Sequence, residues 1–299
     1  MNTHKSHSAD VLNDIRDYWY SPSFIALMAE RWKLHQIKSM LDVGCGIGHW
    51  GQLLIPFLSQ DAKTSGIDPE IEWIKAAEDR AQQKNLRNTT YQLGTAEQIP
   101  YPDHHFDMVT CQTVLVHVKD VSIALDEMLR VLKPGGLIAI AEPNNLVQRV
   151  IFNNLTFHDS INDIVNLLRF ELICEHGREN LGKGNASRGD LIPYYFHQAR
   201  LQSIEVYQSD LADYFIPPYT TPREECALQG LNDENETFWN AAQNEMKEFY
   251  LAGSGLPQDF EKYWHLFIQH KNRILDGYKN KTLCSPGGTL MYLISGIKK

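Results

Sequence analysis

The chain has 299 residues, of which 43% are hydrophobic and 22% are charged, as in an ordinary globular protein. Its net charge of −9 argues against sequence-independent binding to nucleic acid or to an anionic membrane. No apolar stretch approaches the roughly 20 residues that a membrane span needs. The five cysteines show no CxxC spacing, so we expect no metal site and no disulfide framework, and a cytoplasmic location is the default expectation.

The N-terminal part is expected to be a polar tail followed by helices. Residues 1–10 lack the apolar core of a signal peptide and are predicted to be disordered. Residues 11–37 carry apolar side chains at helical spacing, and Pro22 divides them into two predicted helices, with Ser21 as the N-cap of the second. These helices either cover the mouth of a site on the sheet or pack against the sheet as outer helices.

From residue 38 onward, short apolar runs alternate with amphipathic segments, a pattern typical of a parallel sheet with helices on both faces. The predicted strands are 39–43, 64–67, 89–93, 106–111 and 137–141, and the predicted helices are 49–59, 70–84 and one that begins at Asp120. Residues 133–136 end the last helix, because proline disfavours helix before it and glycine turns the chain. The predicted fold class is therefore α/β with a doubly wound sheet.

The regular alternation lapses after Pro143. Residues 145–176 are predicted to be helical. Residues 177–189 are basic and rich in glycine, and they form either an anion-binding loop or a flexible surface loop. The remaining predicted elements are a helix at 190–200, a sixth strand at 203–207, aromatic-rich helices within 211–283 and a closing strand at 289–297.

The glycine turn (residues 44–48) carries the clearest chemical signal. Gly44, Gly46 and Gly48 follow the first strand, so a ligand can approach the peptide groups closely and meet the N-terminus of the next helix. We expect a nucleotide-like cofactor there, although a turn without a ligand is the alternative. The spacing lacks the third glycine of the G-x-G-x-x-G dinucleotide motif, and Asp42 before the turn suits a cationic amino group.

Two further segments are expected to hold an adenosine. Asp68 ends the second predicted strand, where a carboxylate accepts hydrogen bonds from the ribose hydroxyls of either NAD or S-adenosylmethionine; a helix N-cap is its alternative role. Pro69 is expected to press on the adenine face. The backbone groups of Ala96 and Glu97 are expected to meet the adenine edge, although Glu97 is equally consistent with a solvated turn.

Five blocks of sequence occur in one order at suitable spacings, at 41–48, 66–68, 94–100, 106–109 and 130–136. Together they resemble the class I S-adenosylmethionine-dependent methyltransferases, in particular those similar to the ubiquinone/menaquinone-biosynthesis enzymes. The resemblance implies a Rossmann-like, seven-stranded, mostly parallel sheet whose last strand is antiparallel and lies between strands five and six. It also implies S-adenosylmethionine as cofactor and S-adenosylhomocysteine as product.

The resemblance also indicates site residues. Many relatives carry aspartate where this chain has Thr95, so the adenine contact of Thr95 is expected to be weak and to pass to Glu97 or to backbone. In related enzymes the segment after strand four lines the methionine half of the cofactor, and Gln112 is the candidate for that contact. His117 and Glu142 are the candidate catalytic residues, since either group can take a proton from an acceptor. Packing of His117 and helix capping by Glu142 are the alternatives.

These observations favour a methyltransferase that acts on a small molecule under a helical lid by in-line transfer. The alternatives are a non-catalytic S-adenosylmethionine-binding sensor or partner subunit and, less favoured, a protein or tRNA methyltransferase or an NAD-dependent reductase. No nucleic-acid partner is expected, and a monomer and a homodimer are both open. The predicted parts are a tail at 1–10, N-terminal helices at 11–37, a cofactor-binding core at 38–144, a lid segment with strand six at 145–210, a helical insertion at 211–283 and a final strand at 284–299.

Overall fold

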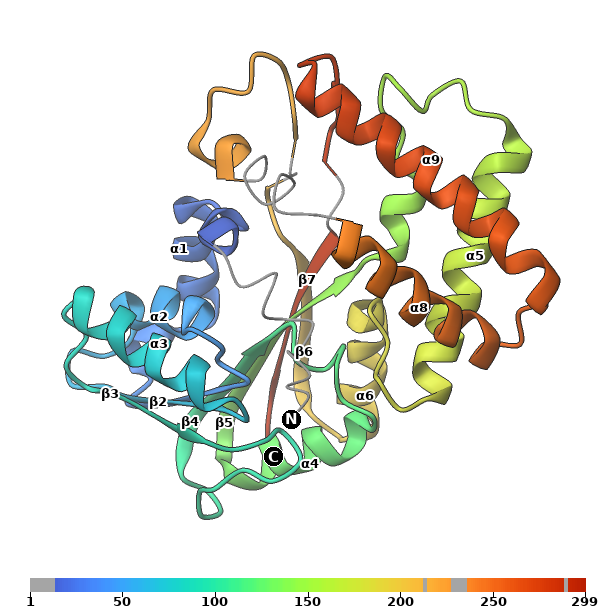
Figure 1. Ribbon diagram of the computed structural model, residues 1–299. Coiled ribbons are helices and arrows are strands. Elements are labelled where there is room, and N and C mark those ends of the chain that lie inside the picture. The colour runs from blue at the N-terminus through green and yellow to red at the C-terminus, as the bar shows by residue number, and fades with distance from the viewer. Residues whose placement is uncertain (1–13, 212–213, 227–235, 288–289) are drawn as a thin grey trace.

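A seven-stranded sheet forms the centre of the molecule (Figure 1). The computed structural model describes residues 14–211, 214–226, 236–287 and 290–299, so the predicted tail at 1–10 lies outside the described residues. The strands are β1 (Ser39–Val43), β2 (Lys63–Asp68), β3 (Thr89–Leu93), β4 (Phe106–Gln112), β5 (Leu132–Asn144), β6 (Gln202–Gln208) and β7 (Leu290–Ile297). Their order is β3-β2-β1-β4-β5-β7-β6, and β7 runs antiparallel to both of its neighbours while the other strand pairs are parallel. The predicted doubly wound sheet and its antiparallel last strand are confirmed.

The carboxyl ends of the central strands meet at one edge of the sheet. The register pairs Val43 at the end of β1 with Ile67 in β2 and with Cys111 in β4. The residues that follow are the glycine turn, Asp68 and Gln112, so three segments far apart in the sequence arrive at the same edge. Ligands bind at this edge in open parallel sheets.

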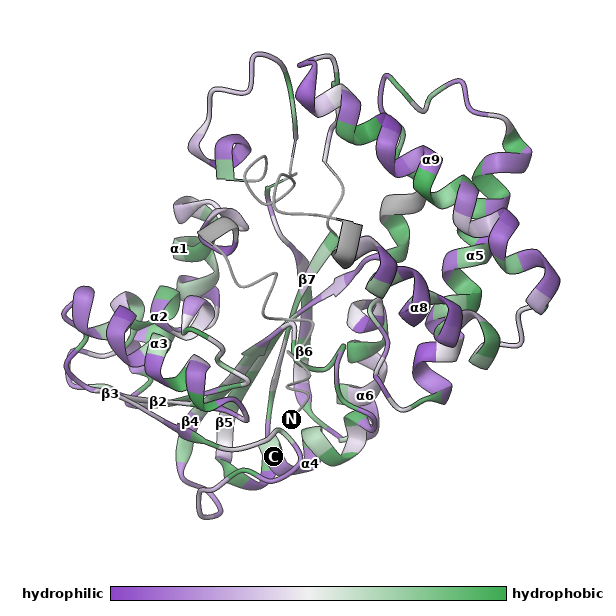
Figure 2. Ribbon diagram, in the orientation of Figure 1, coloured by the Kyte–Doolittle hydropathy of each residue, from purple (hydrophilic) through white to green (hydrophobic). Residues whose placement is uncertain are grey.

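Helices cover both faces of the sheet. They include α1 (Pro22–Arg31), α2 (His49–Leu54), α3 (Ile71–Gln83), α4 (Val121–Val131) and α6 (Ile192–Gln198). One apolar core joins α1 and α2 to the sheet face that carries Met40 and Met108, and another joins α4 and α6 to the face that carries Leu41 and Val109. Consecutive strand residues thus supply opposite cores, as the pleat requires. In Figure 2, α3 and α9 mix hydrophilic with hydrophobic residues, as expected of helices with one buried face.

Two helix predictions near the N-terminus need correction. The first predicted helix within residues 11–37 is a short 3-10 turn in its described part, whereas the second is α1, and Ser21 Oγ caps it by accepting from the Phe24 amide at 3.1 Å. Helix α2 ends at Leu54 rather than at residue 59, because Pro56 has no amide to donate. The short 3-10 helices are η1 (Asp14–Tyr18), η2 (Leu34–Gln36), η3 (Ile55–Phe57), η4 (Leu146–Val150), η5 (Arg188–Leu191) and η6 (Pro257–Asp259).

The fifth strand is longer than predicted. Helix α4 ends at Val131, as the proline and glycines of residues 133–136 require, but the chain is extended from Leu132 onward. Leu132 already pairs with Phe106, and the register shifts before the pairing continues further along the two strands. The residues that end the helix therefore also begin the strand.

The helical additions build a core of their own. Helices α5 (Ile161–Asn180), α8 (Glu236–Ala252) and α9 (Phe260–Lys279) lie together beside the sheet (Figure 1). Their shared core includes Phe170, Tyr250 and Trp264. None of the helices in the described ranges is both long and apolar enough to cross a membrane.

The prediction of continuous helix over residues 145–176 is wrong. Only η4 and the first part of α5 are helical there. Asn153 breaks the run, because its side-chain oxygen accepts from the amides of Leu155 and Thr156 at 2.9 and 3.2 Å and so forms a turn. Helix α5 then begins with Ser160 as its N-cap, whose hydroxyl accepts from the Asp163 amide at 3.1 Å.

Candidate cofactor site

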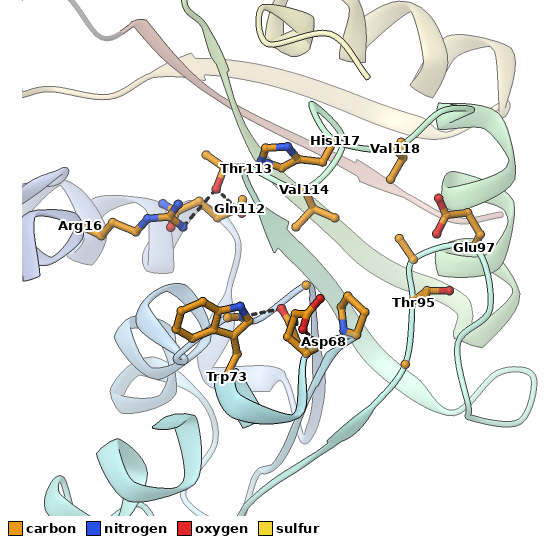
Figure 3. A pocket seen from close by; sticks show the side chains of 16 residues that line it. Arg16, Asp68, Trp73, Thr95, Glu97, Gln112, Thr113, Val114, His117 and Val118 are labelled. Carbon is orange, nitrogen blue, oxygen red and sulfur yellow. Dashed lines mark hydrogen bonds between the residues drawn. The ribbon is translucent and has the colours of Figure 1, made fainter. Parts of the chain in front are cut away.

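A pocket of about 260 Å³ opens at the carboxyl edge of the sheet (Figure 3). Of the residues proposed from the sequence, those that line it are Gly44, Gly46, Asp68, Pro69, Thr95, Ala96, Glu97, Gln112 and His117. Gly48, Asp42 and Glu142 do not line it. The topology thus brings most of the predicted site residues to one cavity, and their individual binding roles stay predictions.

The glycine turn has a backbone that needs glycine. Gly44, Gly46 and Gly48 all have positive φ angles, of 64°, 52° and 83°. A Cβ at Gly44 would lie 2.5 Å from a methyl group of Val114 on the opposite wall. At Gly48 it would lie 2.5 Å from the Gln52 side chain, so this third glycine serves the packing of α2. The first two glycines therefore keep the floor of the pocket open.

Asp68 is held rigidly by the glycine turn. Its Oδ2 accepts from the Gly46 amide at 2.9 Å, and its Oδ1 accepts from the Glu70 amide at 3.0 Å. Burial raises the pKa of this carboxyl, while the two amides act in the opposite direction. The N-cap position of α3 is Glu70 rather than Asp68, but Asp68 still accepts from the Glu70 amide just before the helix. Each Asp68 oxygen retains acceptor capacity for a hydroxyl group in the pocket.

Asp42 lies behind the turn with one oxygen unsatisfied. Its Oδ2 accepts from the Gly51 amide at 2.9 Å, whereas its buried Oδ1 has no hydrogen-bond partner among the described residues. Burial raises the pKa of Asp42 to about 7, and the nearby Asp68 adds to the shift. An unsatisfied buried acceptor calls for a donor. Asp42 does not line the pocket, so its predicted contact with a cationic amino group stays a prediction, whereas Asp68 and the open glycine floor fit the adenosine of S-adenosylmethionine.

The opposite wall of the pocket is the segment 112–118, which follows β4. Gln112 donates to the Tyr20 hydroxyl at 2.8 Å and is buried. Thr113 has a φ of 53°, which is unusual for a β-branched residue and marks a strained backbone at the site. The hydrogen bonds of Gln112 before it and of Val114 after it hold the Thr113 backbone in this conformation.

Glu142 supports this wall from behind. It is fully buried, and its Oε1 accepts from the amides of Val114 and Leu115 at 2.8 and 2.7 Å. Burial raises the pKa of Glu142 to about 7, against the effect of these amides. Its predicted alternative role as a helix cap belongs instead to Asn144, which accepts from the Leu146 amide at 3.1 Å. The position of Glu142 suits holding the wall rather than meeting an acceptor molecule.

His117 lines the pocket and contacts the helical additions. Its Nδ1 lies 3.3 Å from Nη2 of Arg178 on α5, and since a guanidinium only donates, Nδ1 is the accepting nitrogen. A Cβ at Gly184 would lie 2.1 Å from the Val116 carbonyl, so the chain after α5 packs directly on the wall. The nitrogen that a general base would use is therefore already engaged by Arg178.

The predicted basic loop at 177–189 is only partly a loop. Helix α5 continues to Asn180, so Arg178 lies on a helix. Arg188 is buried and donates to Glu179 at 3.4 Å, which contradicts a flexible surface loop at that position. Lys183 lies on the surface and pairs with Glu248 at 3.3 Å.

The pocket residues that were not predicted from the sequence include Trp73 and Arg16. Trp73 reaches the pocket from the first turn of α3, and Arg16 reaches it from η1 (Figure 3). The available signals were an aromatic residue shortly after Asp68 and a single cation within an aromatic N-terminal segment. Within the ranges that the structure describes, no three His, Cys, Asp or Glu residues are grouped so as to hold a metal ion.

Comparisons with known proteins agree with this geometry. Residues 34–166 match the family described as a methyltransferase domain. An uncharacterized methyltransferase of Bacillus subtilis, YcgJ, is 33% identical over 118 residues, which is 40% of this chain and 46% of the relative. The demethylmenaquinone methyltransferase of Listeria welshimeri is 32% identical over 130 residues, which is 42% of this chain and 55% of the relative.

A solved structure extends the similarity of fold. The crystal structure of the YcgJ protein from Bacillus subtilis covers 93% of this chain and 99% of its own, with a TM-score of 0.50 and 21% sequence identity. By sequence, the chain spans about half the length of the curated relatives it matches. The family match therefore covers strands β1 to β5 and most of the pocket lining, and it ends near the start of α5.

Proposed function

We propose that the whole chain transfers a methyl group from S-adenosylmethionine to a small-molecule acceptor, because residues 34–166 match a methyltransferase domain. The observation that carries the proposal is the pocket that joins the glycine turn, Asp68, the 94–97 segment and the 112–118 wall. An adenosine with a charged tail requires a carboxylate for its ribose hydroxyls, backbone groups for the adenine edge and an open glycine floor.

The residues of the chain have separate tasks in this proposal. The cofactor supplies a methyl group that is already activated for displacement. Asp68 accepts from the ribose hydroxyls, and the backbone at Ala96 and Glu97 meets the adenine edge. The 112–118 wall, held by Glu142, orients the reacting end and restricts water. Positioning of this kind provides acceleration without a dedicated base.

A small-molecule acceptor is supported by what surrounds the pocket. η1 lies on one side of it, and α5 with the chain after it lies on the other, through Arg178 and Gly184. Such neighbours suit a small molecule better than a duplex nucleic acid, and the net charge of −9 points the same way. The relative from Listeria is named for a small-molecule reaction, which adds support.

Calorimetric binding separates this proposal from its alternatives. We expect S-adenosylhomocysteine to bind and NAD not to bind. Asp68→Ala is expected to weaken binding by about 100-fold, since charge-assisted hydrogen bonds are lost. Asp61→Ala, which removes an exposed acid before the amino end of β2, is the control and should bind normally. Binding of NAD without S-adenosylhomocysteine would refute the proposal.

Catalysis needs a second measurement. Transfer of a labelled methyl group from S-adenosylmethionine to small molecules of a cell extract is expected with the wild type and not with Asp68→Ala. Binding without any transfer, to small molecules or to macromolecules, would instead favour the non-catalytic sensor. Label found only in protein or tRNA would contradict the small-molecule acceptor.

A further inference from the structure

Arg16 is a cation that lines the pocket, and the charge of the buried Glu142 acts on it without an ion pair between the two. The Nη1 of Arg16 donates to Thr113 Oγ1 at 3.3 Å, while its Nε is buried and has no hydrogen-bond partner among the described residues. No carboxylate in the described part of the chain lies at ion-pair distance from it. Burial lowers the pKa of Arg16 to about 10. A cation that is largely removed from water is costly unless an anion joins it.

The contacts of neighbouring residues fix the position of Arg16. We call residues 14–20 the N-terminal strap. Asp17, the next residue, accepts from Nη2 of Arg80 on α3 at 2.5 and 2.6 Å and lies 2.7 Å from Nδ1 of His49 on α2. Burial alone would raise the pKa of Asp17, but the hydrogen bonds from His49 and Arg80 hold it well below its ordinary value. The strap is thus fixed to two helices that flank the glycine turn.

The other end of the strap is fixed to the pocket wall. Tyr20 accepts from Gln112 through its hydroxyl at 2.8 Å, and it is itself buried. Arg16 directly precedes Asp17, and its guanidinium carbon lies 5.0 Å from the centroid of the Trp19 ring. Its guanidinium therefore has little freedom to move to solvent, and Figure 3 shows it directed toward Gln112 and Thr113.

The charges that line the pocket differ between its two ends. Asp68, Glu70 and Glu97 line the end expected to hold adenosine, whereas Arg16 comes from the opposite side, next to Thr113. Beyond its adenosine, S-adenosylmethionine carries a sulfonium, an ammonium and a carboxylate. Of these three groups, only the carboxylate is attracted by a guanidinium. The two parallel N–H donors of the guanidinium match the planar geometry of the carboxylate.

We propose that Arg16, presented by the N-terminal strap, binds the carboxylate at the amino-acid end of the cofactor. The inference rests on the proposed function. Arg16 lies outside the segment 34–166 that matches the methyltransferase domain, so the proposed contact comes from a part of the chain before that segment. A carboxylate on the acceptor molecule would have the same chemistry, and the experiment distinguishes the two sources.

The test compares two ligands that differ only in the carboxylate, S-adenosylmethionine and its decarboxylated form. Calorimetry on the wild-type chain is expected to show that S-adenosylmethionine binds about 10- to 100-fold more tightly. Arg16→Gln should bring the two dissociation constants within about 3-fold of each other, chiefly by weakening S-adenosylmethionine. Arg16→Lys should give an intermediate ratio of the two dissociation constants, since lysine keeps the charge but lacks the paired N–H donors of the guanidinium.

Arg31→Gln is the matched control, because it removes the same charge from an exposed position on α1. It should retain the wild-type ratio. An unchanged ratio in Arg16→Gln overturns the inference and leaves the proposed function standing, and this is also the result that an acceptor carboxylate would give. An equal loss for both ligands would make Arg16 merely structural and overturns it too. Failure of the wild type to bind S-adenosylmethionine overturns the proposed function together with the inference.

Discussion

At the scale of single residues, the carboxylates of the site divide by what they face. Asp68 lines the pocket, whereas Asp42 and Glu142 stand behind it and accept from backbone amides. Two buried acids with raised pKa values are costly to ionise. They are tolerated because they fix the glycine turn and the 112–118 wall, which no apolar side chain can do.

Glu142→Gln should change the pH dependence of stability. The pKa of Glu142 is raised from 4.5 to about 7, so the folded state holds its proton more tightly than the unfolded state does. The wild type therefore loses stability as pH rises from about 4.5 to 7, and the loss is complete above that range. Glutamine keeps the oxygen that accepts from Val114 and Leu115. We expect urea unfolding to show equal stability at pH 4.5 and a variant more stable by about 1–3 kcal/mol at pH 8.

Two further variants check this interpretation. Glu142→Ala should be less stable than the wild type at both pH values, by about 2 kcal/mol, because two buried amides lose their acceptor. Asp42→Asn should remove a second, similar part of the pH dependence, since burial raises that pKa from 3.8 to about 7. If Glu142→Gln were less stable at pH 8, the wall would depend on the charge itself.

At the scale of elements, helices α5 and α8 touch through two glycines. A Cβ at Gly177 would lie 1.7 Å from the Phe249 carbonyl oxygen, and one at Gly253 would lie 1.9 Å from that of Ile173. Backbone atoms cannot rotate away as a side chain can. This contact lets the two helices pack at backbone distance, around the core that contains Phe170 and Tyr250.

Gly177→Ala should therefore destabilise the helical additions, although alanine has the higher helix propensity. We expect a loss of about 3 kcal/mol or more in unfolding free energy, together with faster proteolysis within α5 and α8. Asn162→Ala, at an exposed position of α5, is the control and should change stability by less than about 0.5 kcal/mol. A stabilised Gly177→Ala variant would show that the helices are not packed so closely.

The core sheet could be predicted from sequence because its signals are local. Strands β1 and β3 have the bounds expected from apolar runs bordered by glycine, proline and polar residues. The region 145–160 was wrongly predicted because its turn depends on one side chain, that of Asn153, competing with helical hydrogen bonds. Apolar spacing does not reveal such competition.

The site could be predicted only where a motif specifies backbone shape. The glycine turn and Asp68 belong to such motifs. Arg16 and Trp73 do not, and they reach the pocket because the strap and α3 dock there. The placement of Glu142 behind the wall likewise depends on tertiary packing, which gives that carboxylate two amides to accept.

At the scale of the whole molecule, the pocket is lined by residues within 16–118 and lies beside the contact between two parts that have separate cores. The sheet with its flanking helices supplies the floor and one wall, while the aromatic core of α5, α8 and α9 is distinct from the cores on the sheet. These two parts meet near the pocket through Arg178 and Gly184. A ligand in the pocket should therefore leave the interior of the helical additions unchanged.

Hydrogen exchange with two ligands tests this arrangement across the chain. S-adenosylhomocysteine and 5′-methylthioadenosine share the adenosine and the thioether, but only the former has the amino-acid end. Both should slow exchange at 68–73 and 94–98, because both fill the adenosine end. Only S-adenosylhomocysteine should slow exchange in the strap at 14–20, since its carboxylate reaches Arg16.

Helix α5 is the internal control, because its amides are already protected by helical hydrogen bonds and by the aromatic core. Arg16→Gln should abolish the difference between the two ligands at 14–20 while the protection at 68–73 remains. Protection confined to α5, α8 and α9 would place the ligand outside the pocket. Equal protection of the strap by both ligands would show that the strap closes on adenosine, because the missing carboxylate would then make no difference to its docking.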